Sequence, residues 1–160
     1  MNIKPKKALA AALLALLAGG CAPILDLMDG PAAEPEGRSL HQHLREKQYQ
    51  GWELWPGSLE LAPSSFPHGN FQSTRVNGRA ARAIKGKREL PSGSLIVKEE
   101  FDAQKRFEAL SVMLKQEDGQ WFFARYEGNS LVEYPDKEGL CLSCHLGQKA
   151  NDYVYLSRAR

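Results

Sequence analysis

Two cysteines and a histidine near the C-terminus carry the most specific chemistry in this sequence. They form the run Cys141-Leu142-Ser143-Cys144-His145. Thiols at this spacing can each add to one vinyl group of a haem, and the imidazole that follows can bind the iron as an axial ligand. The run therefore predicts one covalently attached haem c per chain. Cys141 and Cys144 are its attachment points, and His145 is the proximal ligand of the haem iron.

Two other interpretations of the cysteine pair compete with haem attachment. A structural zinc site needs about four ligands, but the other histidines (His41, His43 and His68) lie far upstream, and there is no second C-x-x-C. A thioredoxin-like redox pair belongs early in a strand–helix unit, whereas this pair lies close to the end of the chain. Haem attachment is favoured over both.

The first twenty residues have the composition of an export signal. Three lysines precede an apolar run of Ala and Leu that ends at Leu17, and this run is too short to be taken as a membrane span. Small residues then precede Cys21, in the order of a bacterial lipobox. We expect a lipoprotein signal peptide over residues 1–20, lipidation of Cys21, and a periplasmic protein anchored by lipid to a bacterial membrane. Ala22, in place of an acidic residue, favours the outer membrane.

Charge and cysteine count agree with that assignment. The whole sequence has 21 Lys and Arg against 19 Asp and Glu. Three of the lysines belong to the signal, so the mature chain has 18 against 19 and a net charge near −1. A role in binding nucleic acid, argued from basicity, therefore has no support. One of the three cysteines goes to lipid and two to haem, which leaves none for a disulfide, although the compartment allows one.

The mature chain divides into a tether and one domain. Residues 21–38 contain several Pro and Gly and little hydrophobic periodicity, which indicates a flexible tether. Residues 39–160 are long enough for a single core and are interpreted as the haem domain. No internal repeat is present.

The domain is expected to begin with a short helix. Ser39 and Gln42 have the spacing of a capping box, which predicts a helix that runs to about Gln50. His41 and His43 lie on this helix. Either could in principle reach iron, but a solvent-exposed helix histidine is the more common case.

The rest of the domain is rich in strand and turn signals. Strands are expected over 70–76, 94–101, 110–115 and 121–126. Asn77 can cap a short helix over 79–85. A turn at 90–93 precedes the second of these strands, and 117–119 is a hairpin signal between the last two. Consecutive strands joined by tight turns pair antiparallel. The fold class is α+β: a mainly antiparallel β-sheet with short peripheral helices and a C-terminal haem-attachment segment.

The strand over 94–101 gives Lys98 two possible environments. Side chains alternate along a strand, so Lys98 shares a face with Ile96 and Glu100. Leu95, Val97 and Glu99 lie on the other face, whose two apolar residues make it the favoured core side. Lys98 is then either beside a haem edge or in solvent, where lysines are common on exposed strands.

The sequence offers no obvious second protein ligand for the iron. No methionine follows His145, which excludes the small helical electron carriers, and the β-rich second half excludes a four-helix cytochrome. Met113 lies on a strand, where a core methionine is the default interpretation. If the iron were nevertheless six-coordinate, Met113 or His68 would be the ligand to test.

The order of the motifs resembles that of a known family. The quoted segments are Pro67-His68-Gly69, Val76-Asn77 before a short helix, Pro91-x-Gly93-Ser94-x-Ile96-Val97-Lys98-Glu99, Val112-Met113-x-Lys115, Trp121 and the terminal Cys141-x-x-Cys144-His145. In this order they resemble the cytochrome P-460 family, including its cytochrome c′-beta relatives. The resemblance spans roughly residues 68–145.

The resemblance implies a mostly antiparallel β fold, a homodimer, and a five-coordinate c-type haem that is open on its far side. In the hydroxylamine-oxidising members a lysine is bonded to the porphyrin edge, and that position falls on Lys98. The c′-beta members bind nitric oxide without this bond, in a pocket capped by phenylalanines. Phe71 and Phe66 are the candidates for that distal wall.

Two further positions follow from the resemblance. The pocket arginine of the hydroxylamine-oxidising branch is replaced here by Gln72, which departs from the pattern of that branch. Glu133 and Glu138 are the candidates for its distal acidic residue. With Lys98, Gln72 and Glu133 are therefore the candidate catalytic residues.

Three classes of function remain open. The first is a haem protein that binds or oxidises small nitrogen compounds, and whether it is an enzyme stays open. The second is a membrane-tethered electron carrier with a six-coordinate haem, which passes electrons to a redox partner cytochrome. The third is a non-haem domain whose cysteines hold a metal. The motif and the resemblance favour the first.

Overall fold

The computed structural model describes residues 37–65, 67–127 and 140–156. The expected signal peptide, most of the tether and Cys21 lie outside the described residues, as do Phe66, Glu133 and Glu138. Within the described ranges, no helix has the length and apolar character needed to cross a membrane.

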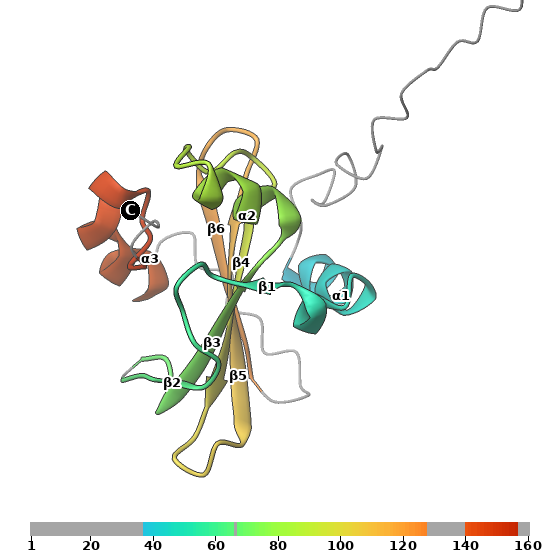
Figure 1. The fold of residues 1–160 in the computed structure, drawn as a ribbon, viewed down its shortest axis with the longest axis vertical. Coiled ribbons are helices and arrows are strands. Elements are labelled where there is room, and N and C mark those ends of the chain that lie inside the picture. The colour runs from blue at the N-terminus through green and yellow to red at the C-terminus, as the bar shows by residue number, and fades with distance from the viewer. Residues whose placement is uncertain (1–36, 66, 128–139, 157–160) are drawn as a thin grey trace, which may run out of the picture.

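Six strands form one antiparallel sheet (Figure 1). They are β1 (Glu53–Leu54), β2 (Ala62–Pro63), β3 (Phe71–Val76), β4 (Leu95–Phe101), β5 (Phe107–Lys115) and β6 (Trp121–Glu127). The strand order is β1-β3-β4-β5-β6, and β2 also pairs with β3. The four expected strands and their antiparallel pairing are confirmed. The two-residue strands β1 and β2 lie in a segment expected to be loop.

Short helices accompany the sheet. They are α1 (Gly37–Glu46), the 3-10 helix η2 (Tyr49–Gly51), α2 (Gly78–Lys85), α3 (Leu140–His145) and the 3-10 helix η3 (Leu146–Asn151). The expected cap of α2 is confirmed, because the Asn77 side chain accepts a hydrogen bond from the Ala80 amide at 3.0 Å. The expected capping box at Ser39 is wrong. Helix α1 already begins at Gly37, so Ser39 lies inside its first turn.

Both faces of the sheet are buried. Helix α1 packs Leu40 and Leu44 against the face that carries Leu95 and Val97, here called the α1 face. Helix α2 and residues 140–156 cover the opposite face, here called the C-terminal face. Figure 1 shows α1 and α3 on opposite sides of the sheet. The expectation that the Leu95 side is the core side was therefore incomplete, because each face has its own core.

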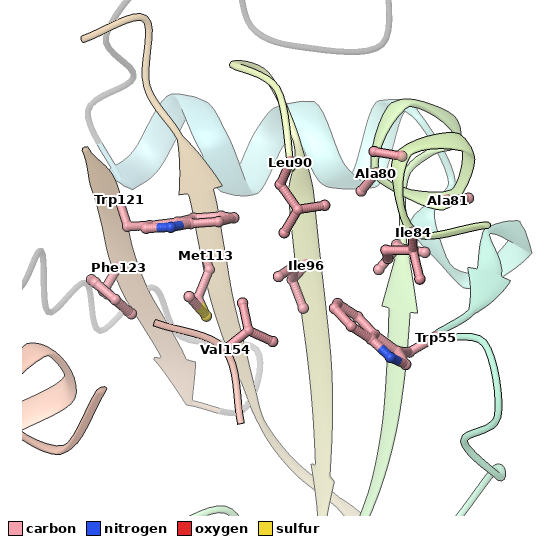
Figure 2. Close-up of a cluster of buried hydrophobic side chains, with 12 residues drawn as sticks. Trp55, Ala80, Ala81, Ile84, Leu90, Ile96, Met113, Trp121, Phe123 and Val154 are labelled. Carbon is pink, nitrogen blue, oxygen red and sulfur yellow. The ribbon is translucent and has the colours of Figure 1, made fainter. Parts of the chain in front are cut away.

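The C-terminal face holds a hydrophobic cluster to which three parts of the chain contribute (Figure 2). Ile96 and Met113 come from the central strands, and Ile84 comes from α2. Val154 is only 3% exposed and lies over the same strands, although it comes from the C-terminal segment. The cluster therefore fastens the segment that carries the cysteine motif to the sheet.

Strand register arranges the C-terminal face in rows. The first row is apolar and consists of Val76, Ile96, Met113 and Phe123. The next row is polar and consists of Thr74, Lys98, Ser111 and Arg125. Beyond it lie Gln72, Glu100, Ala109 and Glu127. Directly opposed side chains in an antiparallel sheet are about 5 Å apart, so each row is a line of neighbours, and apolar surface gives way to polar surface in one step.

Candidate haem site

Helix α3 carries the cysteine motif and lies against the C-terminal face. Cys141 is half-buried and, with Leu142, packs against the hydrophobic cluster, whereas Cys144 is exposed. Neither thiol is part of a disulfide among the described residues. Residues three apart lie on the same side of a helix. The helix therefore presents two thiols on one side, as attachment to a single haem would require.

The orientation of His145 is fixed by a backbone carbonyl. Its Nδ1 lies 2.6 Å from the carbonyl oxygen of Tyr153. Because a carbonyl can only accept, Nδ1 carries the hydrogen and Nε2 keeps a lone pair that is available to a metal. The ring lies 5.1 Å from that of Phe123 and 5.3 Å from that of Tyr155, centroid to centroid. This is the arrangement of a preorganised axial ligand.

The surroundings of His145 favour its neutral form, which is the form that binds metal. Burial lowers the pKa of His145 below its ordinary value, and the nearby charges of Lys98 and His68 lower it further. The hydrogen bond to Tyr153 acts in the opposite direction without reversing the shift.

A buried carboxylate organises the polar part of the same face. Glu100 is 0% exposed. Its Oε1 accepts hydrogen bonds from His68 Nδ1, at 2.9 Å, and from the Ser111 hydroxyl. Its Oε2 accepts from Nε and Nη2 of Arg125, at 3.2 and 3.0 Å. Burial by itself would raise the pKa of Glu100, but these hydrogen bonds and the Arg125 charge hold it below its ordinary value.

Lys98 lies on the C-terminal face and is half-buried. Its amine makes no hydrogen bond or ion pair with any residue in the described ranges. Burial lowers the pKa of Lys98 to about 8, and the Glu100 charge opposes this only in part. A minority of the amine, although a far larger fraction than in an ordinary lysine, is therefore neutral and nucleophilic near physiological pH. The interpretation of Lys98 as a solvated edge lysine does not fit this environment.

Gln72 also belongs to this face. It lies directly opposite Glu100 in the register of β3 and β4 and is half-buried. Its Oε1 is buried and has no hydrogen-bond partner among the described residues. A buried polar atom without a partner is unusual in a folded protein and points to a ligand or water at that position.

Other candidate residues lie elsewhere. Phe71 pairs with Phe101 and so faces away from Lys98, with the amine of Lys105 5.2 Å from its ring centroid. His41 and His43 lie on α1, which covers the opposite face, and the His41 ring stacks on Tyr126 at 4.7 Å. They are half-buried, not solvated as expected. Met113 is confirmed as a core residue, 8% exposed.

Sequence reasoning missed three residues of the site. Arg125 and Ser111 bind Glu100, and the Tyr153 carbonyl orients His145. Alternation along β6 could have placed Arg125 on the same face as Phe123. Nothing local in the sequence could have paired it with Glu100, because the two strands are separated by β5.

The residues around the motif fit a large apolar group. Five large hydrophobic side chains are exposed in the described part of the chain, and three of them flank the cysteine motif: Leu140 (87%), Leu146 (51%) and Tyr155 (56%). A porphyrin held by the two thiols would cover apolar surface of this kind. No group of three or more His, Cys, Asp or Glu side chains within residues 37–65, 67–127 and 140–156 is placed to hold a metal ion, so the zinc interpretation gains no support there.

Comparison with known protein families agrees with this site. The family model described as Cytochrome P460 matches residues 46–156, which is more than half of the chain. The chain belongs to the cytochrome P460 family. Membership implies a haem cofactor and a role in the chemistry of nitrogen compounds. The matched cytochrome P460 region contains β1 to β6, Lys98 and the whole cysteine motif. No curated protein matches the chain.

Proposed function

We propose that this cytochrome P460 is a c-type cytochrome that binds or oxidises small nitrogen compounds. Nitric oxide and hydroxylamine are the compounds proposed. The observation that carries the proposal is the imidazole of His145, held by the Tyr153 carbonyl at 2.6 Å with Nε2 free, beside a polar cluster on the sheet. When bound, the haem supplies an iron that can take up such a ligand and exchange electrons with it.

Each part of the site has a distinct task in holding the cofactor. Cys141 and Cys144 form the thioether bonds. His145 binds the iron from one side, as the neutral imidazole. The ring of Phe123 lies against that of His145 and limits rotation of the imidazole. With His145 as its one protein ligand, the proposed five-coordinate iron would have an open position for the nitrogen compound.

The polar rows supply what a nitrogen substrate needs besides iron. Oxidation of hydroxylamine releases protons together with electrons, so groups that accept protons must lie nearby. His68, whose ring lies against the Glu100 carboxylate, is proposed as such a group. The Oε1 of Gln72, which has no hydrogen-bond partner among the described residues, can accept a hydrogen bond from an N–H or O–H group. Glu133 remains the proposed acidic residue of the distal side. Electrons would leave through a redox partner cytochrome.

Lys98 is proposed to lie beside the porphyrin edge, whether or not a bond joins the two. Its half-buried amine has no hydrogen-bond partner among the described residues and a pKa of about 8, and it is suited to either arrangement. Protease digestion and mass spectrometry distinguish them, because the haem-bearing Cys141–Cys144 peptide either carries the Lys98 peptide or does not. An absorption spectrum that is unchanged in Lys98→Met would place Lys98 away from the haem.

The cellular setting is also a proposal. The sequence before Cys21 supports export and lipidation, and therefore a periplasmic protein tethered to a bacterial membrane. Ala22, the residue after the cysteine, favours the outer membrane. The family resemblance supports a homodimer. Neither the membrane anchor nor the homodimer depends on the haem site.

The central test is haem attachment followed by ligand binding. The full chain is produced together with haem-attachment machinery, and a denaturing gel is stained for haem. We expect stain in the wild type and none in the Cys141→Ala/Cys144→Ala variant. The reduced wild type should bind nitric oxide and carbon monoxide, with a change in its visible spectrum. A wild type without covalent haem would overturn the proposal. So would a reduced wild type whose visible spectrum does not change when either gas is added.

A further inference from the structure

We infer that helix α2 and the turn after it form the docking surface for an acidic electron acceptor, a small c-type cytochrome with a negatively charged surface. The docking surface consists of four exposed side chains, Arg82, Lys85, Lys87 and Arg88, and is here called the α2 surface. The inference rests on the proposed function in that the electron comes from the haem of this chain. It adds the charge of the redox partner and the place where that partner binds.

The first argument is that basic charge is concentrated in this part of the chain. Residues 78–89 contain five Lys and Arg and a single acidic residue, Glu89. The expected mature chain has 18 Lys and Arg against 19 Asp and Glu, so without this segment it would have 13 against 18. A basic surface on an otherwise acidic protein orients the molecule toward an acidic partner and raises the rate of productive encounter.

The helix dipole does not account for all of these charges. Cations near a helix C-terminus are stabilised by the dipole, which explains Arg82 and Lys85 in the last turn of α2. Lys87 and Arg88 lie beyond the end of the helix, where that effect has faded. Their charge therefore calls for a different explanation.

Two other basic residues of this segment have clear structural roles. The half-buried Arg79 donates from Nη1 to the Ser92 carbonyl at 2.8 Å, which ties α2 to the turn before β4. Lys85 forms an ion pair with Glu53 of β1, and both side chains are exposed. Lys87 and Arg88 are therefore the residues whose replacement tests docking with the least effect on the fold.

The second argument is the backbone conformation at Lys87. The Lys87 amide donates to the Ile84 carbonyl at 3.0 Å, and the Arg88 amide donates to the Ala83 carbonyl at 2.9 Å. This pair of bonds closes the helix with Lys87 in the left-handed region, at a φ of 52°. Glycine is the usual residue at such a position, because it has no Cβ to strain the backbone. A lysine that occupies it at a cost in stability points to a role for its side chain.

The third argument is that the α2 surface lies close to the haem-attachment segment. The inner side of α2 contributes Ala80 and Ile84 to the hydrophobic cluster of the C-terminal face (Figure 2), and Cys141 packs against the same cluster. Only the helix itself, about 10 Å across, separates the α2 surface from this cluster. Interfaces for electron transfer are small, so a few charges at this position are enough to hold an acceptor briefly near the haem.

An anionic membrane is the other partner that such charges can attract. Helices that lie on a membrane insert an apolar side among the lipids, but the apolar side of α2, with Ala80 and Ile84, is already buried in the core. The chain from the proposed lipid anchor enters the domain at α1, which covers the opposite face of the sheet. Both observations favour an acidic protein over a lipid surface.

Electron transfer from the haem-loaded full chain tests this inference. The reduced protein is mixed with an oxidised carrier, and the oxidation of its haem is followed by stopped-flow absorption. The carriers are a small basic cytochrome c and the same cytochrome made acidic by succinylation of its lysines. Each event moves one electron, which oxidises the haem of this chain and reduces that of the carrier. The rate constant with the acidic carrier should be the larger one and should fall steeply with added salt.

Lys87→Gly/Arg88→Gln should lower the rate constant with the acidic carrier about tenfold at low salt and weaken its dependence on salt. Its midpoint in urea should be unchanged or higher, because glycine relieves the left-handed backbone at position 87. A slower reaction can then not be attributed to unfolding.

Lys105→Gly/Arg106→Gln is the matched control. It also removes an adjacent Lys–Arg pair, and Lys105 also has left-handed backbone, with a φ of 62°. This pair lies in the turn between β4 and β5, at the end of the sheet far from α2 (Figure 1). The control should react as fast as the wild type. An equal loss in both double variants would overturn the inference, because net charge alone would then explain the rates.

Retention on a column of the immobilised acidic carrier is a second readout, and it does not require haem in this chain. The wild type and the control should elute at a higher salt concentration than Lys87→Gly/Arg88→Gln. Elution of all three at the same salt concentration would contradict docking at the α2 surface.

Each outcome assigns the failure to one proposal. A chain with no covalent haem defeats the proposed function, and column retention still tests the α2 surface. A haem-loaded chain that binds nitric oxide, but reacts with both carriers equally fast at every salt concentration, defeats only the α2 surface. The α2 surface would instead face the membrane if Lys87→Gly/Arg88→Gln abolished binding to phosphatidylglycerol vesicles and left the rate with the acidic carrier unchanged.

Discussion

Arg125 on β6 donates two hydrogen bonds to the buried carboxylate of Glu100 on β4, two strands away. The strand between them contributes Ser111, whose hydroxyl binds the other carboxylate oxygen. Three neighbouring strands are thereby joined through side chains at one point of the C-terminal face. Such a contact stabilises the sheet at the place where the polar surface of the site begins.

Glu100→Gln should therefore destabilise the protein considerably. The amide keeps the shape of the side chain but leaves the guanidinium of Arg125 without its buried counter-charge. We expect a loss of about 3 kcal/mol in the free energy of unfolding, the order found when one member of a buried ion pair is removed. Urea denaturation measures it. Glu127→Gln is the control: Glu127 also pairs with Arg125 but is exposed, so its loss should cost less than about 1 kcal/mol.

The same carboxylate predicts how stability depends on pH. The pKa of Glu100 is lower in the folded protein than in the unfolded chain. Its contribution is therefore fully present above the ordinary glutamate pKa, and it is lost as the pH falls through the folded value. Unfolding free energies measured from pH 7 to pH 3 should fall more steeply for the wild type than for Glu100→Gln. Parallel curves for the two proteins would contradict the prediction.

Lys98→Met should stabilise the protein at neutral pH. The folded structure lowers the pKa of Lys98 to about 8 from its ordinary 10.5, so the charged amine opposes folding at pH 7. Removing it should raise the free energy of unfolding by about 2 kcal/mol. Wild-type stability should rise between about pH 8 and pH 10.5, where the unfolded chain still holds a proton that the folded protein has released. The advantage of the variant should shrink over the same range.

Lys47→Met is the matched control for that experiment. Lys47 is exposed, and its replacement should change stability by no more than about 0.5 kcal/mol at any of these pH values. An equal effect of both substitutions would mean that overall charge, and not the environment of Lys98, is responsible.

Asp152 should prove important for docking the C-terminal segment. Its Oδ1 accepts from the Lys115 amine at 2.5 Å and from the Trp121 indole at 3.0 Å. Its backbone has a φ of 54°, in the left-handed region. Asp152→Ala removes the oxygen that accepts both hydrogen bonds, and alanine is strained at this backbone conformation, so we expect a loss of about 2 kcal/mol in the free energy of unfolding. Hydrogen exchange should accelerate at the Tyr153 amide.

Asp152→Asn provides the comparison. Asparagine tolerates left-handed backbone and keeps an oxygen for Trp121, losing mainly the charge that pairs with Lys115. Its effect should be less than half that of Asp152→Ala. If the two variants behave alike, the charge pair and not the hydrogen-bond geometry holds the segment.

Cys21→Ser should release the protein from the membrane. Lipidation requires the thiol, so the serine variant should move from the membrane fraction to the soluble periplasm, as cell fractionation measures. Its haem content and gas binding should be those of the wild type, because residue 21 is not one of the residues to which the motif at 141–145 assigns haem attachment. Unchanged fractionation would exclude Cys21 as the anchor.

The sequence alone determined the features that depend on residues close together in the chain. The motif at 141–145 predicts haem attachment because thiols and imidazole must be neighbours to act on one haem. The Asn77 cap, the turn at 117–119 and the four long strands follow from local propensity and alternation, and all are confirmed. Alternation also placed Lys98 and Glu100 together on one face of β4.

The tertiary structure decided what strand pairing and packing bring together. Strands β1 and β2 exist because the edge of β3 offers them hydrogen bonds, not because their two-residue sequences favour strand. The register between β3 and β4 turned Phe71 away from Lys98 and placed Gln72 beside Glu100. Likewise, Glu100 forms hydrogen bonds with His68 and Arg125, and the ring of His68 lies near that of His145. The residues of each pair are 25 or more positions apart in the chain. No local pattern encodes such contacts, because they arise only when register and packing fix the positions of separate segments in space.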